Sequence, residues 1–108
     1  TSDTNMQPNV GYIINNSTAD NRLILTLPTG NSENSRLEVI GRSVGGWRVA
    51  QNAGQKITFG YMETIEGTGG YMESSHGNDF VKLVCVNSAG NTPTEFVVAG
   101  SVGSIIVY

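Results

Sequence analysis

Apolar and polar residues alternate with a period of two through most of this chain. Leu23, Leu25 and Leu27 fall on one side of an extended segment, and Ile24 falls on the other. Because successive side chains of a β-strand point to opposite faces, this pattern predicts strands with one buried face. No segment shows the 3.6-residue period of an amphipathic helix. The alternation recurs in residues 12–14, 36–39, 47–49, 56–59, 80–85, 95–98 and 105–108.

Turn-forming residues separate these segments. The chain has 108 residues, enough for one domain, and 14 of them are glycine. Asn52-Ala53-Gly54 lies between two alternating segments, and Asn and Gly tolerate the positive φ that a tight hairpin needs. About eight to ten short strands joined by such turns predict an all-β fold, a β-sandwich or jelly roll.

Composition excludes several classes of partner. With a formal net charge of -3, the chain lacks the clustered Lys and Arg of nucleic-acid-binding proteins and of polybasic membrane anchors. Cys85 is alone, so it forms no internal disulfide and no Cys-based metal site, and its strand context predicts a buried thiol. We expect no metal and no cofactor.

The second faces of several predicted strands are also apolar. One small sandwich has a single interior, so a further surface must cover these side chains. We expect them to form an interface between copies of the chain. This candidate trimer interface comprises Ile24, Ile40, Val84, Val86, Val97 and Ile106.

Residues 60–64, Gly-Tyr-Met-Glu-Thr, are nearly repeated at residues 70–74, Gly-Tyr-Met-Glu-Ser. The turn-forming residues between the copies predict one hairpin in which the copies are the two arms, with Ile65 opposite Gly70. Its aromatic and methionine side chains suit contact with a partner, or packing against a neighbouring protomer. The candidate receptor-contact residues are Tyr61, Met62, Tyr71, Met72 and His76.

Three arginines fall on outward strand positions and are candidates for binding a small anionic ligand. A guanidinium offers a fork of donors matched to carboxylate or phosphate. The alternative is ordinary surface salt bridges with Glu38 and its neighbours. The arginines are Arg36, Arg42 and Arg48.

Catalytic patterns are weak. Ser, His and Asp all occur within residues 74–79, but triad members usually come from distant parts of a chain. Glu63 and Glu73 are the first carboxylate pair to test for glycoside cleavage. Because none of these catalytic patterns is strong, we expect no enzyme activity.

Several segments together resemble the C-terminal head domain of bacteriophage tail proteins, above all the trimeric knob of the tail needle in short-tailed phages of enteric bacteria. The resemblance covers residues from about 10 to 108 and rests on the order and spacing of the segments. They are GGWRVAQNAGQKITFG at 45–60, EGTGG at 66–70, DFVKLVCV at 79–86, TEFVV at 94–98 and GSIIVY at 103–108.

This resemblance implies a trimeric jelly roll similar to viral fibre heads and to the tumour-necrosis-factor superfamily. Residues 1–9 would be a linker from an upstream shaft, and residues 10–108 the single knob domain. The implied role is to contact the host surface, aid envelope penetration and plug the genome channel, at the tail tip of the virion or as a soluble extracellular protein when free. The implied partner is a host cell-surface glycan or outer-membrane component. The alternative is a carbohydrate-binding or depolymerising module of a tailspike.

Overall fold

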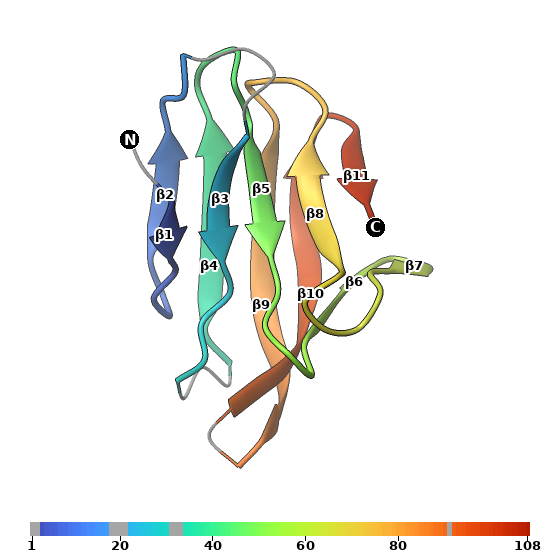
Figure 1. Ribbon diagram of the computed structural model, residues 1–108. Helices are drawn as coiled ribbons and strands as arrows, with labels where there is room; N and C mark the ends of the chain where they lie inside the picture. Colours follow the sequence, from blue (N-terminus) through green and yellow to red (C-terminus); the bar gives the residue numbers. More distant parts are fainter. Residues whose placement is uncertain (1–2, 18–21, 31–33, 91) are drawn as a thin grey trace.

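The computed structural model describes residues 3–17, 22–30, 34–90 and 92–108, and these form a β-sandwich of two packed sheets (Figure 1). No helix occurs among them. The prediction of an all-β sandwich is confirmed. Sheet A contains, in spatial order, β1 (Thr4–Asn5), β3 (Leu23–Thr26), β5 (Trp47–Ala50), β8 (Tyr71–Ser74) and β11 (Ile105–Val107). Sheet B contains β2 (Gly11–Ile14), β4 (Arg36–Gly41), β9 (Phe80–Ala89), β10 (Thr92–Val102), β6 (Lys56–Phe59) and β7 (Met62–Glu63).

The first five strands are placed alternately in the two sheets. As a result, β1, β3 and β5 are parallel neighbours in sheet A, and β2 and β4 are parallel neighbours in sheet B. Parallel strands require a crossover connection, and here the crossover is the strand that the chain adds to the opposite sheet. This connectivity differs from that of two Greek keys, whose neighbouring strands are antiparallel.

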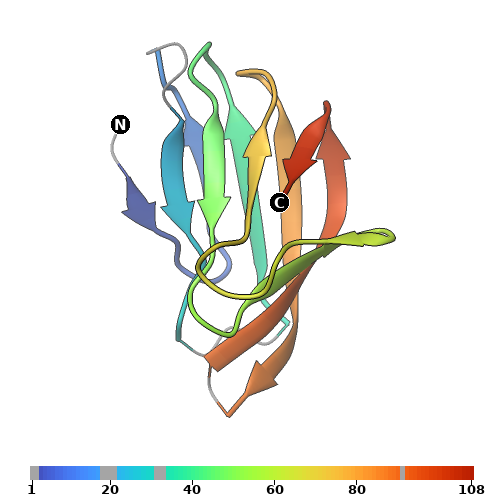
Figure 2. The ribbon, with the colours of Figure 1, turned by 45° about the vertical axis from the view of Figure 1, so that its right-hand side comes forward.

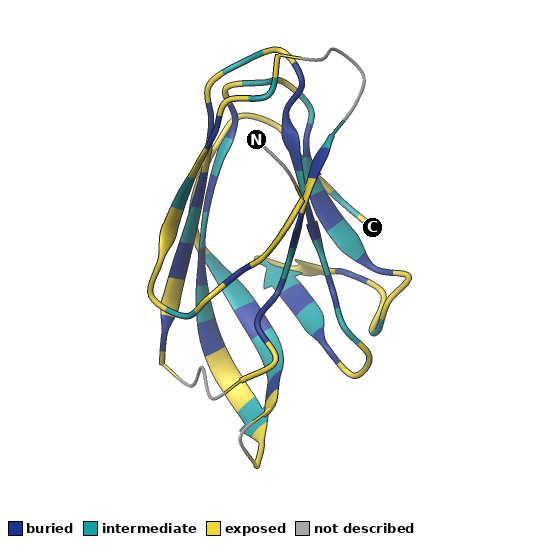
Figure 3. Cartoon of the chain, turned by 60° about the vertical axis from the view of Figure 1, so that its left-hand side comes forward, coloured by how far each residue is buried: buried dark blue, intermediate teal, exposed yellow. Residues whose placement is uncertain are grey.

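The core lies between the sheets and is built from the inward residues of the alternating segments. Figure 3 shows buried and more exposed positions following each other along the strands. Trp47 is fully buried, and its indole Nε1–H donates to the carbonyl oxygen of Asp79 at 2.9 Å. Cys85 is buried, as predicted. The other buried apolar side chains are Met6, Ile14, Leu23, Leu25, Leu27, Leu37, Val39, Val49, Ile57, Met72, Val81, Leu83 and Phe96.

The prediction that residues 60–74 form one hairpin is wrong. The first copy of the repeat enters β7, which pairs with β6 in sheet B, whereas the second enters β8, between β5 and β11 in sheet A. Residues 52–54 likewise connect β5 in sheet A to β6 in sheet B rather than closing a hairpin. Their turn chemistry is as expected, with Gly54 at a φ of 78°. The hairpin prediction fails because local alternation specifies a strand but not the sheet that the strand joins.

A buried polar network holds the connection between the two copies of the repeat. The side-chain amide of Gln51 donates to the carbonyl oxygens of Ile65 and Gly67, each at 2.9 Å, and its oxygen accepts a hydrogen bond from the hydroxyl of Thr64. That hydroxyl also accepts from the backbone N–H of Ile57 at 2.8 Å. The Gln51 side chain thus provides the hydrogen bonds that a neighbouring strand would provide in a regular sheet.

The described part of the expected linker packs on the sandwich. β1 pairs with β3, the Asp3 carboxylate accepts a hydrogen bond from the backbone N–H of Ile24 at 2.9 Å, and Met6 is buried in the core. The boundary at residue 10 therefore falls inside the packed structure. A sequence window of two strand residues carries too little periodicity to show this.

Candidate functional site

The outer face of sheet A carries a compact ionic cluster. Strand register places Arg48 on β5 directly opposite Glu73 on β8. The Nη2 atom of Arg48 lies 3.0 Å from Oε1 of Glu73, and the Nε atom of Arg22 lies 3.3 Å from Oε2 of the same carboxylate. Arg22 Nε also donates to the carbonyl oxygen of Ser74 at 3.0 Å. Each oxygen of one carboxylate is therefore used by a different arginine.

Two tyrosines extend this cluster toward the edge of the sheet. The Cζ atom of Arg48 lies 4.1 Å from the ring centroid of Tyr71, a cation–π contact. The rings of Tyr71 and Tyr108 are stacked, with centroids 5.0 Å apart. Backbone hydrogen bonds of 2.9 and 3.0 Å between these two tyrosines hold the stack in register. We call Arg22, Arg48, Tyr71, Glu73 and Tyr108 the arginine–tyrosine patch.

The side chains of the patch have an excess of positive charge. The patch contains two guanidinium groups and one carboxylate, and the Glu73 side chain is only 12% exposed. Nε of Arg48 is buried and makes no hydrogen bond within the described part of the chain. Both arginine side chains remain partly exposed, at 25% and 37%. A cluster of this kind can accept a further oxyanion.

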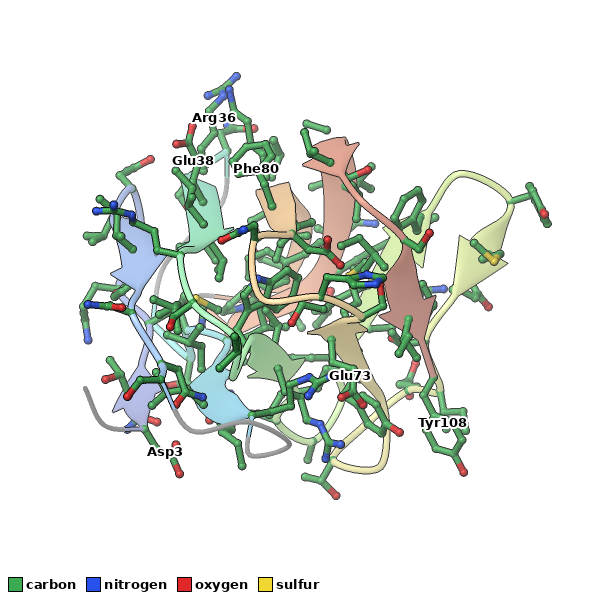
Figure 4. All side chains as sticks on the ribbon, turned by 90° about the horizontal axis from the view of Figure 1, so that it is seen from above. Asp3, Arg36, Glu38, Glu73, Phe80 and Tyr108 are labelled. Carbon is green, nitrogen blue, oxygen red and sulfur yellow. The ribbon has the colours of Figure 1, made fainter. Side chains whose placement is uncertain are left out.

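The three predicted arginines are not brought together. Arg36 and Arg42 stand at opposite ends of β4 on sheet B, whereas Arg48 projects from the outer face of sheet A. Figure 4 shows Arg36 on the opposite side of the molecule from Glu73, the partner of Arg48. Arg48 thus forms a salt bridge, but with Glu73 rather than with Glu38. Oε1 of Glu38 instead lies 3.9 Å from Nζ of Lys82.

Arg22 and Tyr108 were missed by the sequence analysis. Arg22 precedes its strand in an irregular segment, and Tyr108 follows the final strand. The pairing of β3 with β5 brings Arg22 to Arg48, and the pairing of β8 with β11 brings Tyr108 to Tyr71. No local pattern in the sequence points to this cluster, because it depends on which strands pair.

Ser75, His76 and Asp79 lie together, but not in the order of a catalytic triad. Oδ2 of Asp79 accepts hydrogen bonds from the backbone N–H groups of Ser75 and His76 at 2.9 and 3.1 Å, and from the Ser75 hydroxyl at 3.0 Å. His76 Nδ1 lies 3.0 Å from that hydroxyl and is not oriented by the carboxylate, as a triad histidine is. The buried Asp79 side chain instead closes the turn.

Glu63 and Glu73 do not flank a common groove. Glu63 lies on β7 of sheet B, 3.4 Å from the Nζ atom of Lys56, and Glu73 lies on β8 of sheet A between the two arginines. Because each carboxylate belongs to a different sheet and already has a cationic partner, this pair lacks the arrangement used for glycoside cleavage.

The five candidate receptor-contact residues occupy four different environments. Tyr61 and Met62 lie at the projecting β6–β7 hairpin, where Tyr61 is 97% exposed and Met62 39% exposed (Figure 2). Met72 is fully buried in the core, so its expected contact with a partner is wrong. Tyr71 belongs to the arginine–tyrosine patch, and His76 is exposed in the β8–β9 turn. The two copies of the repeat therefore have different roles.

The six candidate interface residues divide between two opposite faces. Ile24 and Ile106 lie on the outer face of sheet A, at the two ends of the cross-strand row that contains Arg48 and Glu73. The other four project from the outer face of sheet B, and they are Ile40, Val84, Val86 and Val97. No single contact can use all six.

Sheet B carries further apolar side chains that the sequence analysis missed. One row of register partners crosses four adjacent strands and consists of Ile13, Ile40, Phe80 and Val102. Three of its members are large exposed hydrophobic residues, and Phe80 is half-buried. Val84 and Val97 are partners in a parallel row, and the Glu38–Lys82 ion pair lies between the rows. We call Ile13, Ile40, Phe80, Val84, Val97 and Val102 the apolar face of sheet B.

Glu95 has a perturbed ionisation. The hydroxyl of Thr58 and the side-chain amide of Asn87 donate to its carboxylate at 2.9 and 3.0 Å, and these bonds hold the pKa of Glu95 below its ordinary value. The charge of Lys56 acts in the same direction, and partial burial opposes it. The carboxylate thus ties β6 and β9 to β10.

A hollow of about 470 Å³ lies beside the N-terminal segment. Its lining is uncharged and includes Asn5, Gln7, Thr26 and Asn52. None of the predicted site residues contributes to it. Among the described residues, no group of three or more His, Cys, Asp or Glu side chains is arranged to hold a metal ion, and no helix is long and apolar enough to span a membrane.

Comparison with models of known protein families finds no match for the chain, and comparison with curated protein sequences finds none either. The resemblance to phage tail heads therefore remains an expectation that rests on the segments quoted above.

Proposed function

We propose that this domain is the trimeric, non-enzymatic head of a phage tail needle or fibre, which contacts the host cell envelope and aids its penetration. The observation that carries the proposal is the apolar face of sheet B, which spans four adjacent strands on the outside of an already complete sandwich. The order of segments in the sequence supplies the link to phage heads.

The occupant of the apolar face is a second copy of this chain. The apolar area of this face that is still exposed favours association in proportion to the area that a partner covers, and an uncovered face of this kind favours aggregation. The Glu38–Lys82 ion pair leaves no net charge between the two apolar rows, and Arg36, the register partner of Val84, lies at the end of the second row.

Closure into a trimer restricts which surfaces can meet. In a cyclic trimer each subunit uses two different patches, and these cannot lie on opposite faces, because contacts between opposite faces build an open stack rather than a ring. The outer face of sheet A is therefore left outside the interface, and sheet B turns toward the threefold axis. Plugging of the genome channel would follow from this closed head sitting at the tail tip.

The β6–β7 hairpin is the surface best placed to touch the cell. The hairpin projects from the sandwich (Figures 1 and 2). Tyr61 lies in its turn, between the paired residues Phe59 and Met62, and is almost fully exposed. An aromatic ring on a short hairpin supplies apolar area at low entropic cost, as anchor residues of interfaces do.

Sedimentation equilibrium of the purified domain tests this assembly. The wild-type domain is expected to be a trimer, and Ile13→Asp and Val102→Asp are each expected to produce monomers, because they place an unpaired charge in the seam. Both side chains are more than half exposed, so the substitutions leave folding of the subunit intact. Val44→Asp, at an equally exposed loop position, is the matched control and should remain trimeric.

A monomeric wild-type domain would overturn the proposed assembly. For the attachment role, virions carrying Tyr61→Ser should adsorb to cells more slowly while the head stays trimeric. Unchanged adsorption would remove the hairpin from the contact.

A further inference from the structure

We propose that the arginine–tyrosine patch binds an acidic sugar, that is, a pyranose that carries a carboxylate. The inference rests on the proposed attachment role for its biological meaning, since it names the ligand class at the cell surface. Its chemistry rests on the patch alone and needs no trimer.

The two guanidinium groups and one carboxylate of the patch leave one positive charge that a further anion can neutralise. Glu73 satisfies Nε of Arg22 and Nη2 of Arg48, and no other hydrogen bond from the side-chain ends of these arginines, beyond that of Arg22 to Ser74, is formed with a described residue. Among the side chains of the patch the excess is one positive charge, on a chain whose formal net charge is -3. This local reversal of charge attracts a small anionic group to the patch.

Glu73 shows which anion fits. Its planar carboxylate is bound with one oxygen on each arginine, at 3.3 and 3.0 Å, so the two side chains are already spaced for a carboxylate. A second carboxylate can approach the free donors of the same two groups from the solvent side. Guanidinium recognises such planar oxyanions through paired hydrogen bonds.

The tyrosine stack supplies the contact for a sugar ring. The Cζ atom of Arg48 lies 4.1 Å from the ring centroid of Tyr71, and the ring centroids of Tyr71 and Tyr108 are 5.0 Å apart. Because these contacts already hold the side chains in place, they lose little conformational freedom when a ligand binds. Tyr108 is 55% exposed and projects from the edge of sheet A in Figure 4. Its open ring offers an apolar surface for the C–H groups of a pyranose whose carboxylate lies on the arginines.

The site is separate from the surfaces used by the proposed assembly. Figure 4 shows Glu73 and Tyr108 on one side of the molecule and Phe80 on the other. A trimer built on sheet B therefore leaves three patches facing outward, and their combined binding exceeds that of one site when a polymer carries many acidic units.

Calorimetric titration with methyl glucuronoside tests the proposal, with methyl glucoside, acetate and inorganic phosphate as separate arms. We expect saturable, salt-sensitive binding of the glucuronoside and none of the neutral glucoside. Arg22→Gln should weaken binding about tenfold or more, because a hydrogen bond to a charged group is lost. Tyr108→Ala should weaken it as well, and Arg36→Gln, on the opposite face, should not.

Four results would overturn the inference: no saturation by the glucuronoside, equal binding of the glucoside, equal binding of acetate or phosphate, or equal loss in the Arg36 control. Thermal melting of each variant checks that the fold is retained. Sedimentation of the same samples separates the two proposals, because binding by a monomer would refute the trimeric head and keep the sugar site. A trimer that does not bind the glucuronoside would refute the sugar site and keep the trimeric head.

Discussion

The two methionines of the repeat give the sharpest test of the fold, because they share a sequence context and differ in burial. Met72 is fully buried on β8, where its register partners are Val49 on β5 and Val107 on β11, whereas Met62 is 39% exposed on β7. Met72→Ala removes the Cγ, Sδ and Cε atoms from the core. At about 0.8 kcal/mol for each methylene-sized group, the transfer term is about 2 kcal/mol. The cavity left between neighbouring strands adds to this, so we expect a loss of about 2–4 kcal/mol.

Urea unfolding followed by tryptophan fluorescence measures this loss directly, since the single Trp47 is buried in the same core. The melting temperature should fall by roughly 10 °C or more in a domain of this size. Met62→Ala is the matched control and should change the free energy of unfolding by less than about 0.5 kcal/mol, as surface substitutions do. Both variants are compared at one protein concentration. Equal effects of the two substitutions, or a loss below about 1 kcal/mol for Met72→Ala, would refute the separation of the repeat between core and surface.

Two further predictions concern the loop between the repeats and the ionisation of Glu95. Gly70→Ala should lower the melting temperature strongly, because an added Cβ would overlap a backbone carbonyl of the same loop, whereas Gly69→Ala meets no atom and should melt like the wild type; similar melting of the two variants would contradict this. Because its folded pKa is depressed, Glu95 stabilises the fold above its unfolded pKa, and this stabilisation should be lost as the pH falls through the depressed folded pKa. In an NMR titration Thr58→Ala should raise the pKa of Glu95 toward its ordinary value, and an unchanged titration would exclude the hydroxyl as the main cause.

Strand positions and the inward residues were predictable from the sequence. Trp47, Phe96 and Leu25 are buried where the alternation places them, and Cys85 is a buried thiol. These outcomes depend only on a property of the chain within a few residues, the period-two exposure of a strand, so local sequence carries the information. Turn residues were equally predictable from the sequence, as the positive φ of Gly54 shows.

The pairing of the strands was not predictable in this way. The two copies of the repeat have almost the same sequence, yet one joins the edge of sheet B and the other enters sheet A between β5 and β11. The strand that accepts each copy lies elsewhere in the chain, and the choice depends on packing across the whole sandwich. Local similarity therefore suggested a hairpin that the fold does not contain.

The candidate site shows the same division between local and tertiary information. Arginine, glutamate and tyrosine at outward positions could be read from the chain, and they define the chemistry that its surface can offer. Strand order and register decide that Arg22, Arg48 and Tyr108 meet. They also place Arg36 on β4 of the other sheet, with Arg42 directly after that strand. A sequence pattern specifies which face of a strand a side chain occupies, but the neighbours across the sheet are set by contacts between residues far apart in the chain, and only the folded structure contains those contacts.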